Sequence, residues 1–499
     1  MPKQLLIGGK WVDSSSGETL AVEDPATGET LVEIADATVE DAKAALGAAD
    51  EAFKTFRDVA PRERADILRR AYDAMIEQAE DLALLMTLEM GKPLVEAKAE
   101  VTYAAAFLRW YSEEAVRING RFTVAEAGGS RLLTMKQPIG PCLFITPWNF
   151  PLAMGTRKIG PAIAAGCTSV VKPAKQTPLS MIMLAKIFED AGLPDGVLNV
   201  LTASSSGSIM EPLIRDDRLR KLSFTGSTAV GKTLIEQSAE QVLKVSMELG
   251  GNAPFLVFED ADLDAAIEGA LIAKMRNGGE ACTSANRFHV HESVAAEFAE
   301  KLAARIGAFK IGRGTDDEVK MGPLIDEAQR TKVADLVSDA VDKGATVLCG
   351  GARVDGPGYF YEPTVLTDVS SNADLLSEEI FGPVAPVIGF ATDDEAIAAA
   401  NNTEYGLVAY VFTQDIKRAF KVIERLDTGM VGLNQGLVST RAPRSAASSS
   451  PGSVAKAGRR ASRSTWRRST WRSTPAPDRG APGSDVFSMT RARVASARA

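Results

Sequence analysis

A glycine-rich stretch, Gly226–Thr233, fits the pattern G-x-x-x-x-G-K-[ST], with which many proteins hold nucleotide phosphates. The pattern needs a strand that leads through a glycine turn to the N-terminus of a helix, where backbone N–H groups bind phosphate. Lys221–Phe224 is predicted as that strand, and the residues after Lys232 as that helix. An apolar run with an acidic end, Phe255–Asp260, even resembles the magnesium-binding strand of nucleotide hydrolases. This stretch therefore predicts a phosphate site.

Cys282 is the second residue that could do chemistry, in the stretch NGGEACTSANR. Paired glycines precede it and a turn is predicted after it, a setting that exposes a thiolate and offers it backbone amides. An isolated cysteine is more often a core residue, but the neighbours Glu280, Thr283 and Asn286 are polar for a core position. Cys282 is therefore a candidate nucleophile.

A cysteine nucleophile usually works with a base, most often a histidine. The two histidines, His289 and His291, alternate on one predicted strand and are better interpreted as surface residues, which disfavours a cysteine protease. A carboxylate is left as the candidate base. Glu248, in SMELGGNAP, ends a predicted strand just before two glycines. Taken alone, such a glutamate is more often a solvated strand end.

The composition limits the class of protein. A chain of 499 residues is too long for one core, so two or three domains are expected. The formal charge of −9 and the pI near 5.2 argue against nucleic acid as a partner. We also expect no signal peptide and no membrane span, and hence a cytoplasmic protein. The cysteines are far apart and lack C-x-x-C spacing, so neither disulfides nor a metal site are predicted.

The elements that must position these residues follow from periodicity. From Thr38, a capping-box start with Asp41, to about Ile118 the chain is helical in period. From about Pro138 short apolar strands alternate with helical segments, which is typical of a doubly wound parallel sheet. A second α/β run extends over about 262–435. After Ser439 the chain is rich in Arg, Ser, Pro and Ala and shows no period, so it is expected to be disordered.

Six motifs, in this order, resemble those of the NAD(P)-dependent aldehyde dehydrogenase superfamily. They are TPWNFP at 146–151, VVKPA at 170–174, FTGSTAVG at 224–231, MELGG at 247–251, NGGEAC at 277–282 and EEIFGPV at 378–384. Six ordered motifs, within a resemblance that spans about 5–439, are far more specific than one phosphate pattern, so a nucleotide hydrolase is rejected.

The resemblance implies an aldehyde-dehydrogenase-like α/β fold with two doubly wound Rossmann-type domains and a protruding β-hairpin arm. The expected parts are an NAD(P)-binding domain (1–116 and 138–248), an oligomerisation hairpin (117–137), a catalytic domain (249–439) and an aberrant basic tail (440–499).

The resemblance also implies roles in catalysis. Cys282 would attack an aldehyde carbonyl as a thiolate, and the Asn149 side chain with the Cys282 backbone N–H would hold the oxyanion. Hydride would leave to the nicotinamide, and Glu248 would then activate the water that hydrolyses the thioester.

The phosphate site would hold the pyrophosphate of NADP or NAD through Gly226, Ser227 and Gly231, while Lys232 is expected to be a solvated helix residue. The other implied cofactor residues are Thr146, Pro147, Trp148, Lys172, Lys175, Glu379 and Phe381. Many NAD-using relatives have glutamate where this chain has Lys175. An ammonium group there tolerates or attracts a 2′-phosphate, so NADP use is a hypothesis.

Within the superfamily the chain looks most like succinate-semialdehyde dehydrogenases. Arg157, Arg276 and Ser439 match positions that bind the distal carboxylate of the substrate, a task that suits the planar guanidinium group. The expected substrate is succinate semialdehyde, with glutarate semialdehyde or a betaine aldehyde as alternatives.

The end of the chain departs from the resemblance. Relatives continue past Ser439 with a stretch like PFGGVKQSGLGREGG, which helps to form the substrate funnel and the subunit interface. Here 444–458 is RSAASSSPGSVAKAG, and a back-translation read one base earlier gives FGGVKQSGLGREGG; the same shift turns Arg463–Trp466 into EYL. We therefore hypothesise a one-base frameshift near Ser439, in the gene or in its sequencing. With an intact C-terminus a homodimer or homotetramer is expected. With a real lesion, an inactive relative that still binds nucleotide is the alternative.

Overall fold

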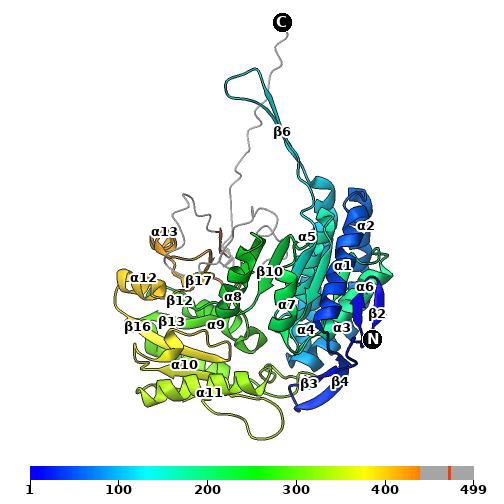
Figure 1. The fold of residues 1–499 in the computed structure, drawn as a ribbon. Coiled ribbons are helices and arrows are strands. Elements are labelled where there is room, and N and C mark those ends of the chain that lie inside the picture. The colour runs from blue at the N-terminus through cyan, green and yellow to red at the C-terminus, as the bar shows by residue number, and fades with distance from the viewer. Residues whose placement is uncertain (439–469, 474–499) are drawn as a thin grey trace, which may run out of the picture.

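The structure is a computed structural model that describes residues 1–438 and, by its backbone, the strand Thr470–Ser473 (Figure 1). Within these residues the strands form two large sheets and two small hairpins, and helices pack on both large sheets. The expected α/β fold with two Rossmann-type sheets is confirmed.

The first sheet has seven strands in the order β11-β10-β7-β8-β9-β1-β2. The strands from β11 to β9 are parallel, and β1 and β2 extend the sheet in antiparallel orientation. Strand order reverses beside β7, because the chain runs from β7 to β8 and β9 and then returns to place β10 on the other side. Ligands of doubly wound sheets bind at the carboxyl ends of strands at such a reversal. The bounds are β1 (Leu5–Ile7), β2 (Lys10–Val12), β7 (Cys142–Ile145), β8 (Ser169–Lys172), β9 (Leu198–Val200), β10 (Lys221–Thr225) and β11 (Lys244–Glu248).

The second sheet has the order β14-β15-β16-β13-β12-β17-β18-β19, and only β14 pairs antiparallel within this set. Strand β19 was not expected from the sequence, which predicted no structure after Ser439. The rest of the tail lies outside the described residues. The bounds are β12 (Ala253–Val257), β13 (Ala285–His291), β14 (Thr346–Cys349), β15 (Thr364–Thr367), β16 (Val384–Phe390), β17 (Val408–Phe412), β18 (Met430–Leu433) and β19 (Thr470–Ser473).

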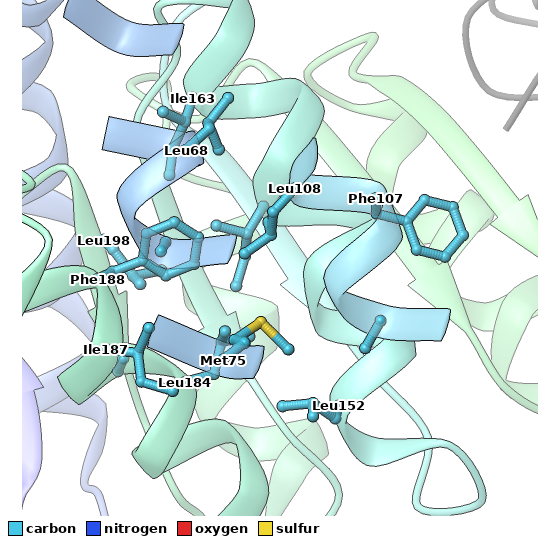
Figure 2. Close-up of a cluster of buried hydrophobic side chains, with 14 of the residues drawn as sticks. Leu68, Met75, Phe107, Leu108, Leu152, Ile163, Leu184, Ile187, Phe188 and Leu198 are labelled. Atoms are coloured by element: carbon cyan, nitrogen blue, oxygen red, sulfur yellow. The ribbon is translucent and has the colours of Figure 1, made fainter. Parts of the chain in front are cut away.

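Helices pack against the first sheet through two apolar cores. The larger core includes Leu68, Leu108, Leu152 and Phe188, which project toward one another in Figure 2. The helices of this half are α1 (Val39–Phe56), α2 (Pro61–Glu77), α3 (Ala79–Met90), α4 (Leu94–Glu114), α5 (Pro151–Ala165), α6 (Leu179–Asp190), α7 (Ser206–Ile214) and α8 (Thr228–Ala239).

The second sheet is covered in the same way. Ring contacts strengthen its core, where Phe255 stacks on Phe412 with centroids 4.8 Å apart. The helices of this half are α9 (Leu263–Met275), α10 (Glu292–Gly307), α11 (Glu327–Asp342), α12 (Asp393–Asn401) and α13 (Ile416–Arg425).

The capping box predicted at Thr38 is present at the start of α1. The Thr38 hydroxyl accepts a hydrogen bond from the Asp41 backbone N–H at 3.2 Å, and the Asp41 carboxylate accepts one from the Thr38 N–H at 2.9 Å. Local sequence therefore fixes where this helix begins.

A two-stranded hairpin protrudes from the body of the molecule, as Figure 1 shows. It consists of β5 (Arg121–Val124) and β6 (Arg131–Thr134), and every residue of both strands is exposed. This is the segment in which the sequence predicted an arm. The other hairpin, β3 (Thr19–Asp24) with β4 (Glu29–Ala35), packs against the body.

The surface position expected for both histidines is wrong for His289. Its side chain is buried in β13, which lies between β12 and β16 inside the second sheet, and burial lowers its pKa to about 3. His291 instead caps α10, where its Nδ1 atom accepts from the Ser293 N–H. Neither ring is placed to act as a base for Cys282.

Candidate active site

The candidate site lies where the carboxyl edge of the first sheet meets the amino edge of the second. Strand β11 ends at Glu248, and after four residues the chain begins β12 in the other sheet. Cys282 stands just before β13, at that same amino edge. Gly251, in the MELGG motif, lies directly against the backbone of Cys282, because a Cβ atom at this position would overlap the Cys282 backbone oxygen. Glu248 and Cys282 are thus brought to one region from different sheets.

A tight turn presents Cys282. Three consecutive residues before it, Asn277, Gly278 and Gly279, have positive φ angles, and a Cβ on Gly279 would overlap the backbone of Gly382. The paired glycines of the motif are therefore required by the backbone. Cys282 itself keeps part of its surface exposed, as a nucleophile needs.

The environment of Cys282 keeps its thiol protonated. Burial is the main cause that raises its pKa to about 11, and the carboxylates of Glu379 and Glu248 add to the rise. Arg157 and Arg276 act in the opposite direction. Attack on a carbonyl as a thiolate therefore requires a base that takes the thiol proton.

Asn149 lies in the loop between β7 and α5, with its side chain buried. Its Nδ2 atom donates a 2.9 Å hydrogen bond to the backbone oxygen of Glu280, two residues before Cys282. This bond uses one of the two amide hydrogens. The second amide hydrogen is left to donate to a ligand oxygen.

Sequence reasoning missed Lys158, a buried lysine on α5. Its Nζ atom donates a 2.9 Å hydrogen bond to the Ser223 hydroxyl. Burial lowers its pKa to about 7, although the nearby Glu248 carboxylate opposes this shift. The available signal was a second cation next to Arg157 in a helix that is otherwise mostly apolar. Lys158 adds a second titratable group next to Glu248.

The phosphate pattern has the predicted order of strand, glycine turn and helix, but α8 (Thr228–Ala239) begins earlier than expected, so that Gly231 and Lys232 lie within it. Strand β10 ends at Thr225, Gly226 follows, and the Ser227 hydroxyl caps α8 by accepting from the Val230 N–H at 3.4 Å. Lys232 is an exposed helix residue that pairs with Glu404 at 3.5 Å, as expected. The turn therefore offers backbone N–H groups at a helix N-terminus.

This turn coincides with the reversal of strand order in the first sheet. Thr146, Pro147 and Trp148 follow β7 directly, and Thr225 ends the neighbouring β10. The buried hydroxyl groups of Thr146 and Thr225 have no hydrogen-bond partner among the residues that the structure describes. Unsatisfied hydroxyls beside a glycine turn fit a polar ligand such as a dinucleotide.

Two lysines stand at the carboxyl end of β8. Lys172 is buried and donates to the Ser206 hydroxyl at the start of α7, whereas Lys175 is exposed. Burial lowers the pKa of Lys172 to about 8, and repulsion by Lys175 adds to the effect. A ligand phosphate near both groups would relieve this repulsion.

The EEIFGPV motif contacts two of the other motifs. The Glu379 carboxylate accepts a 2.8 Å hydrogen bond from the Gly251 N–H, and the Phe381 ring meets Trp148 edge to face with centroids 5.2 Å apart. Burial raises the pKa of Glu379 to about 7, while the Gly251 N–H and two lysines oppose this shift. Glu379 and Phe381 thus lie beside the loops that follow β7 and β11.

The positive charges of both arginines that were predicted to bind substrate affect the pKa of the Cys282 thiol. Arg157 lies with its guanidinium group 5.5 Å from the centre of the Phe107 ring, and Arg276 lies 5.1 Å from that of Phe150. Each lowers the pKa of the thiol. The third predicted substrate residue, Ser439, lies outside the described residues.

Two further features are absent from the described part of the chain. No group of three or more His, Cys, Asp or Glu side chains there could hold a metal ion. Among the helices of residues 1–438, none combines the length and the apolar character that a membrane crossing needs.

Comparison with known proteins gives consistent matches. Residues 11–480 match the model of the aldehyde dehydrogenase family. A succinate-semialdehyde dehydrogenase of Paenarthrobacter nicotinovorans is 58% identical over 412 residues, which cover 83% of this chain and 92% of that protein. An NADP(+) succinate-semialdehyde dehydrogenase of Escherichia coli and a glutarate-semialdehyde dehydrogenase of Pseudomonas putida are each 49% identical over 437 residues, 88% of this chain and 90% of theirs. The crystal structure of an E. coli NADP-dependent enzyme superposes with a TM-score of 0.86 at 49% identity, covering 88% of this chain and 91% of that one.

Proposed function

The chain belongs to the aldehyde dehydrogenase family, and from this premise we propose that it oxidises succinate semialdehyde, or a close semialdehyde acid, to the carboxylate with NADP or NAD. The observation that carries the proposal is the meeting of Cys282, Glu248 and the Asn149 amide at the junction of the two sheets. Arg157 and Arg276, whose positive charges lower the pKa of the same thiol, would also favour a substrate that carries a negative charge.

The proposed chemistry begins at Cys282. Its sulfur attacks the aldehyde carbon and forms a C–S bond, while its proton passes to a base, for which we propose Glu248, one of the two carboxylates whose charge acts on the thiol. The carbonyl oxygen becomes an oxyanion, which accepts hydrogen bonds from the free Asn149 amide hydrogen and the Cys282 N–H. When bound, NAD(P)⁺ supplies the hydride acceptor that converts this thiohemiacetal to a thioester. Glu248 releases the thiol proton to solvent and then takes a proton from the water that attacks the thioester carbon, and Cys282 leaves as the thiolate.

We propose that the cofactor lies across the reversal beside β7. Gly226 and the N-terminus of α8 would hold the pyrophosphate, and Lys172 with Glu379 would bind the two riboses. An exposed cation at Lys175 would tolerate or attract a 2′-phosphate, which favours NADP. The E. coli relative is also named for NADP(+).

The substrate carboxylate would pair with Arg157 and Arg276. Guanidinium groups bind carboxylates through paired hydrogen bonds, and two of them near one thiol repel a cationic substrate such as betaine aldehyde. Glutarate semialdehyde remains the second candidate substrate, because a 49% identical relative is named for it.

We propose that a second copy of the chain covers the hairpin. A two-stranded ribbon is marginally stable alone, and this one exposes large apolar side chains, including Phe122 (70% exposed) and Leu133 (64%). Such a surface fits a subunit interface of a homodimer or homotetramer.

A second candidate function rests on the altered C-terminus. If the residues after Ser439 are read out of frame, the chain lacks groups that the family places in the substrate funnel and interface. The protein would then bind nucleotide without turnover.

The test is a steady-state assay of the full chain that follows the absorbance of reduced nicotinamide. Succinate semialdehyde, glutarate semialdehyde and a neutral aldehyde of similar length are each supplied with NADP⁺ or NAD⁺. We expect kcat/KM to be highest with a semialdehyde acid and no turnover in Cys282→Ser. Cofactor binding, measured by fluorescence titration, with no turnover of any aldehyde would favour the inactive alternative.

A further inference from the structure

We propose that Lys92 is a positioning residue that fixes the backbone of Asn149 and thereby the amide that binds the oxyanion. The inference rests on the proposed function, because it concerns the same oxyanion site. Lys92 lies between α3 and α4 and is only 3% exposed. Its Nζ atom donates hydrogen bonds to Glu100 Oε2 at 2.6 Å and to the backbone oxygen of Asn149 at 2.8 Å.

The contacts of Lys92 go beyond an ion pair. Its ammonium group also lies 4.3 Å from the centre of the Phe150 ring, so two of its three partners are the consecutive residues Asn149 and Phe150. A buried ion pair by itself adds little net stability, because both ions lose their hydration. The orientation of Lys92 toward the loop after β7 is what distinguishes it from a purely structural lysine.

Glu100 binds the backbone just after the same loop, at the start of α5. Its Oε1 atom accepts hydrogen bonds of 3.1 Å from the backbone N–H groups of both Leu152 and Ala153, in the first turn of α5. The Lys92–Glu100 pair therefore connects the carbonyl of Asn149 to the helix that begins two residues later. Rotation of the Asn149 peptide would break a charge-assisted hydrogen bond.

The same peptide is tied to the segment that carries Cys282. Asn277 Nδ2 donates to the backbone oxygens of Asn149 and Glu280, at 3.1 Å each, and Asn149 Nδ2 donates to the Glu280 oxygen at 2.9 Å. The Asn277 backbone N–H is in turn bound by Glu96 at 2.8 Å. Lys92 is the cationic donor to the Asn149 carbonyl, so it holds the peptide from which the Asn149 amide reaches the segment that carries Cys282.

The first test compares Lys92→Met with a matched control, Lys98→Met. Lys98 lies on α4 and likewise pairs with a glutamate, but its side chain is 43% exposed and contacts Glu80 at the surface. Loss of positioning is expected to lower kcat about 10- to 100-fold in Lys92→Met, with KM and cofactor affinity within about threefold of wild type. The control is expected to match wild type. A kcat for Lys92→Met within about twofold of wild type overturns the inference.

A second variant separates positioning from stability. Lys92→Met alone leaves Glu100 buried without its partner, which destabilises the fold. In Lys92→Met/Glu100→Gln the charge of Glu100 is removed together with that of Lys92, and the oxygen of the introduced side-chain amide can still accept from the two N–H groups of α5. We expect its melting temperature to recover while kcat stays low. Recovery of both together means that Lys92 only stabilises the fold, and the inference is then wrong.

Crystal structures of wild type and the double variant decide the inference without turnover. The expected result is a displaced or rotated Asn149 peptide and a changed distance from Asn149 Nδ2 to the Cys282 sulfur. An unchanged Asn149 overturns the inference. If the wild-type protein oxidises no aldehyde, the proposed function fails, and this comparison still decides the role of Lys92.

Discussion

The side-chain amide of Asn149 donates a hydrogen bond of 2.9 Å to the backbone oxygen of Glu280, two residues before Cys282. The donor follows β7 of the first sheet, and the acceptor precedes β13 of the second. This bond thus fixes the two proposed oxyanion donors relative to each other across the junction of the sheets.

Replacement of Asn149 tests the proposed oxyanion site. Asn149→Ala removes one donor and its anchor, so we predict a fall in kcat of about 10²–10³, as for other oxyanion donors. Steady-state assay with succinate semialdehyde measures it. Because the amide acts on charge that develops during the reaction, KM should change little. A loss of less than about threefold would remove Asn149 from the proposed mechanism.

The pKa of Cys282 predicts how the free enzyme reacts with alkylating agents. Burial, with Glu379 and Glu248, raises this pKa to about 11, so the neutral thiol predominates at pH 7. Only the thiolate reacts with iodoacetamide, and its fraction should rise about tenfold for each pH unit until the pKa is approached. Mass spectrometry of the peptide that contains Cys282 measures the rate. A rate that levels off below pH 8 would contradict the prediction.

Glu248→Gln should change reactivity and turnover in opposite directions. Removal of this carboxylate lowers the pKa of Cys282, so alkylation at pH 8 is expected to be faster. Turnover is expected to fall about 10²–10⁴-fold, because the proposed general base is lost. The two measurements use the same preparation. If both rates fall together, misfolding or a different base explains the loss.

Charge reversal at Arg276 tests the recognition of the substrate carboxylate. Arg276→Glu replaces an attractive guanidinium near Cys282 with a repulsive carboxylate, so KM for succinate semialdehyde should rise about 100-fold. KM for a neutral aldehyde should change much less. Competition by succinate, measured as an inhibition constant, should weaken in parallel. Equal effects on both aldehydes would refute the assignment of Arg276 to the substrate site.

Lys175→Glu tests cofactor choice. A carboxylate at this exposed position repels a 2′-phosphate and accepts a ribose hydroxyl, so the ratio of kcat/KM for NADP to that for NAD should fall about tenfold or more. The comparison of both cofactors in one protein removes differences in active-enzyme content. Wild-type efficiency with NAD equal to or above that with NADP would itself contradict the preference.

Local structure that depends only on residues adjacent in sequence was predictable. The Thr38 capping box was predicted correctly, and so was the order of strand, turn and helix around Gly226, although α8 begins at Thr228 and not after Lys232. The buried position of His289 depends on β16, which lies about a hundred residues further along the chain, so local alternation gave the wrong result.

In the candidate site, too, residues within short motifs were predictable and contacts between distant segments were not. Cys282 and Glu248 were found because short motifs surround them. Lys92 acts through its contact with Asn149, a residue distant in sequence, so no local pattern marks it. Asn277 and Glu280 stand within the NGGEAC motif, but their contacts with Asn149 also join distant segments and could not be predicted. The pKa of Cys282 also depends on Glu379, which the chain brings into place from another motif.

Restoration of the reading frame tests the proposed lesion near Ser439. A gene with one base corrected there would encode a stretch like FGGVKQSGLGREGG in place of 444–458. The family places this stretch in the substrate funnel and the subunit interface. We therefore predict that the restored protein has at least about tenfold higher kcat/KM than the protein with the present C-terminus, and that light scattering shows a dimer or tetramer.

A hairpin variant of the restored protein serves as the control for assembly. Phe122→Glu/Leu133→Glu places charges on the exposed ribbon without touching residues near Cys282, so it should reduce the oligomer size. Resequencing of the gene through the codon of Ser439 gives independent evidence. If the chain as given already equals the restored protein in activity and assembly, then the altered C-terminus does not impair the enzyme. The contacts that the family resemblance assigns to that segment would then be unnecessary for this protein, and the substrate site would have to be complete within residues 1–438.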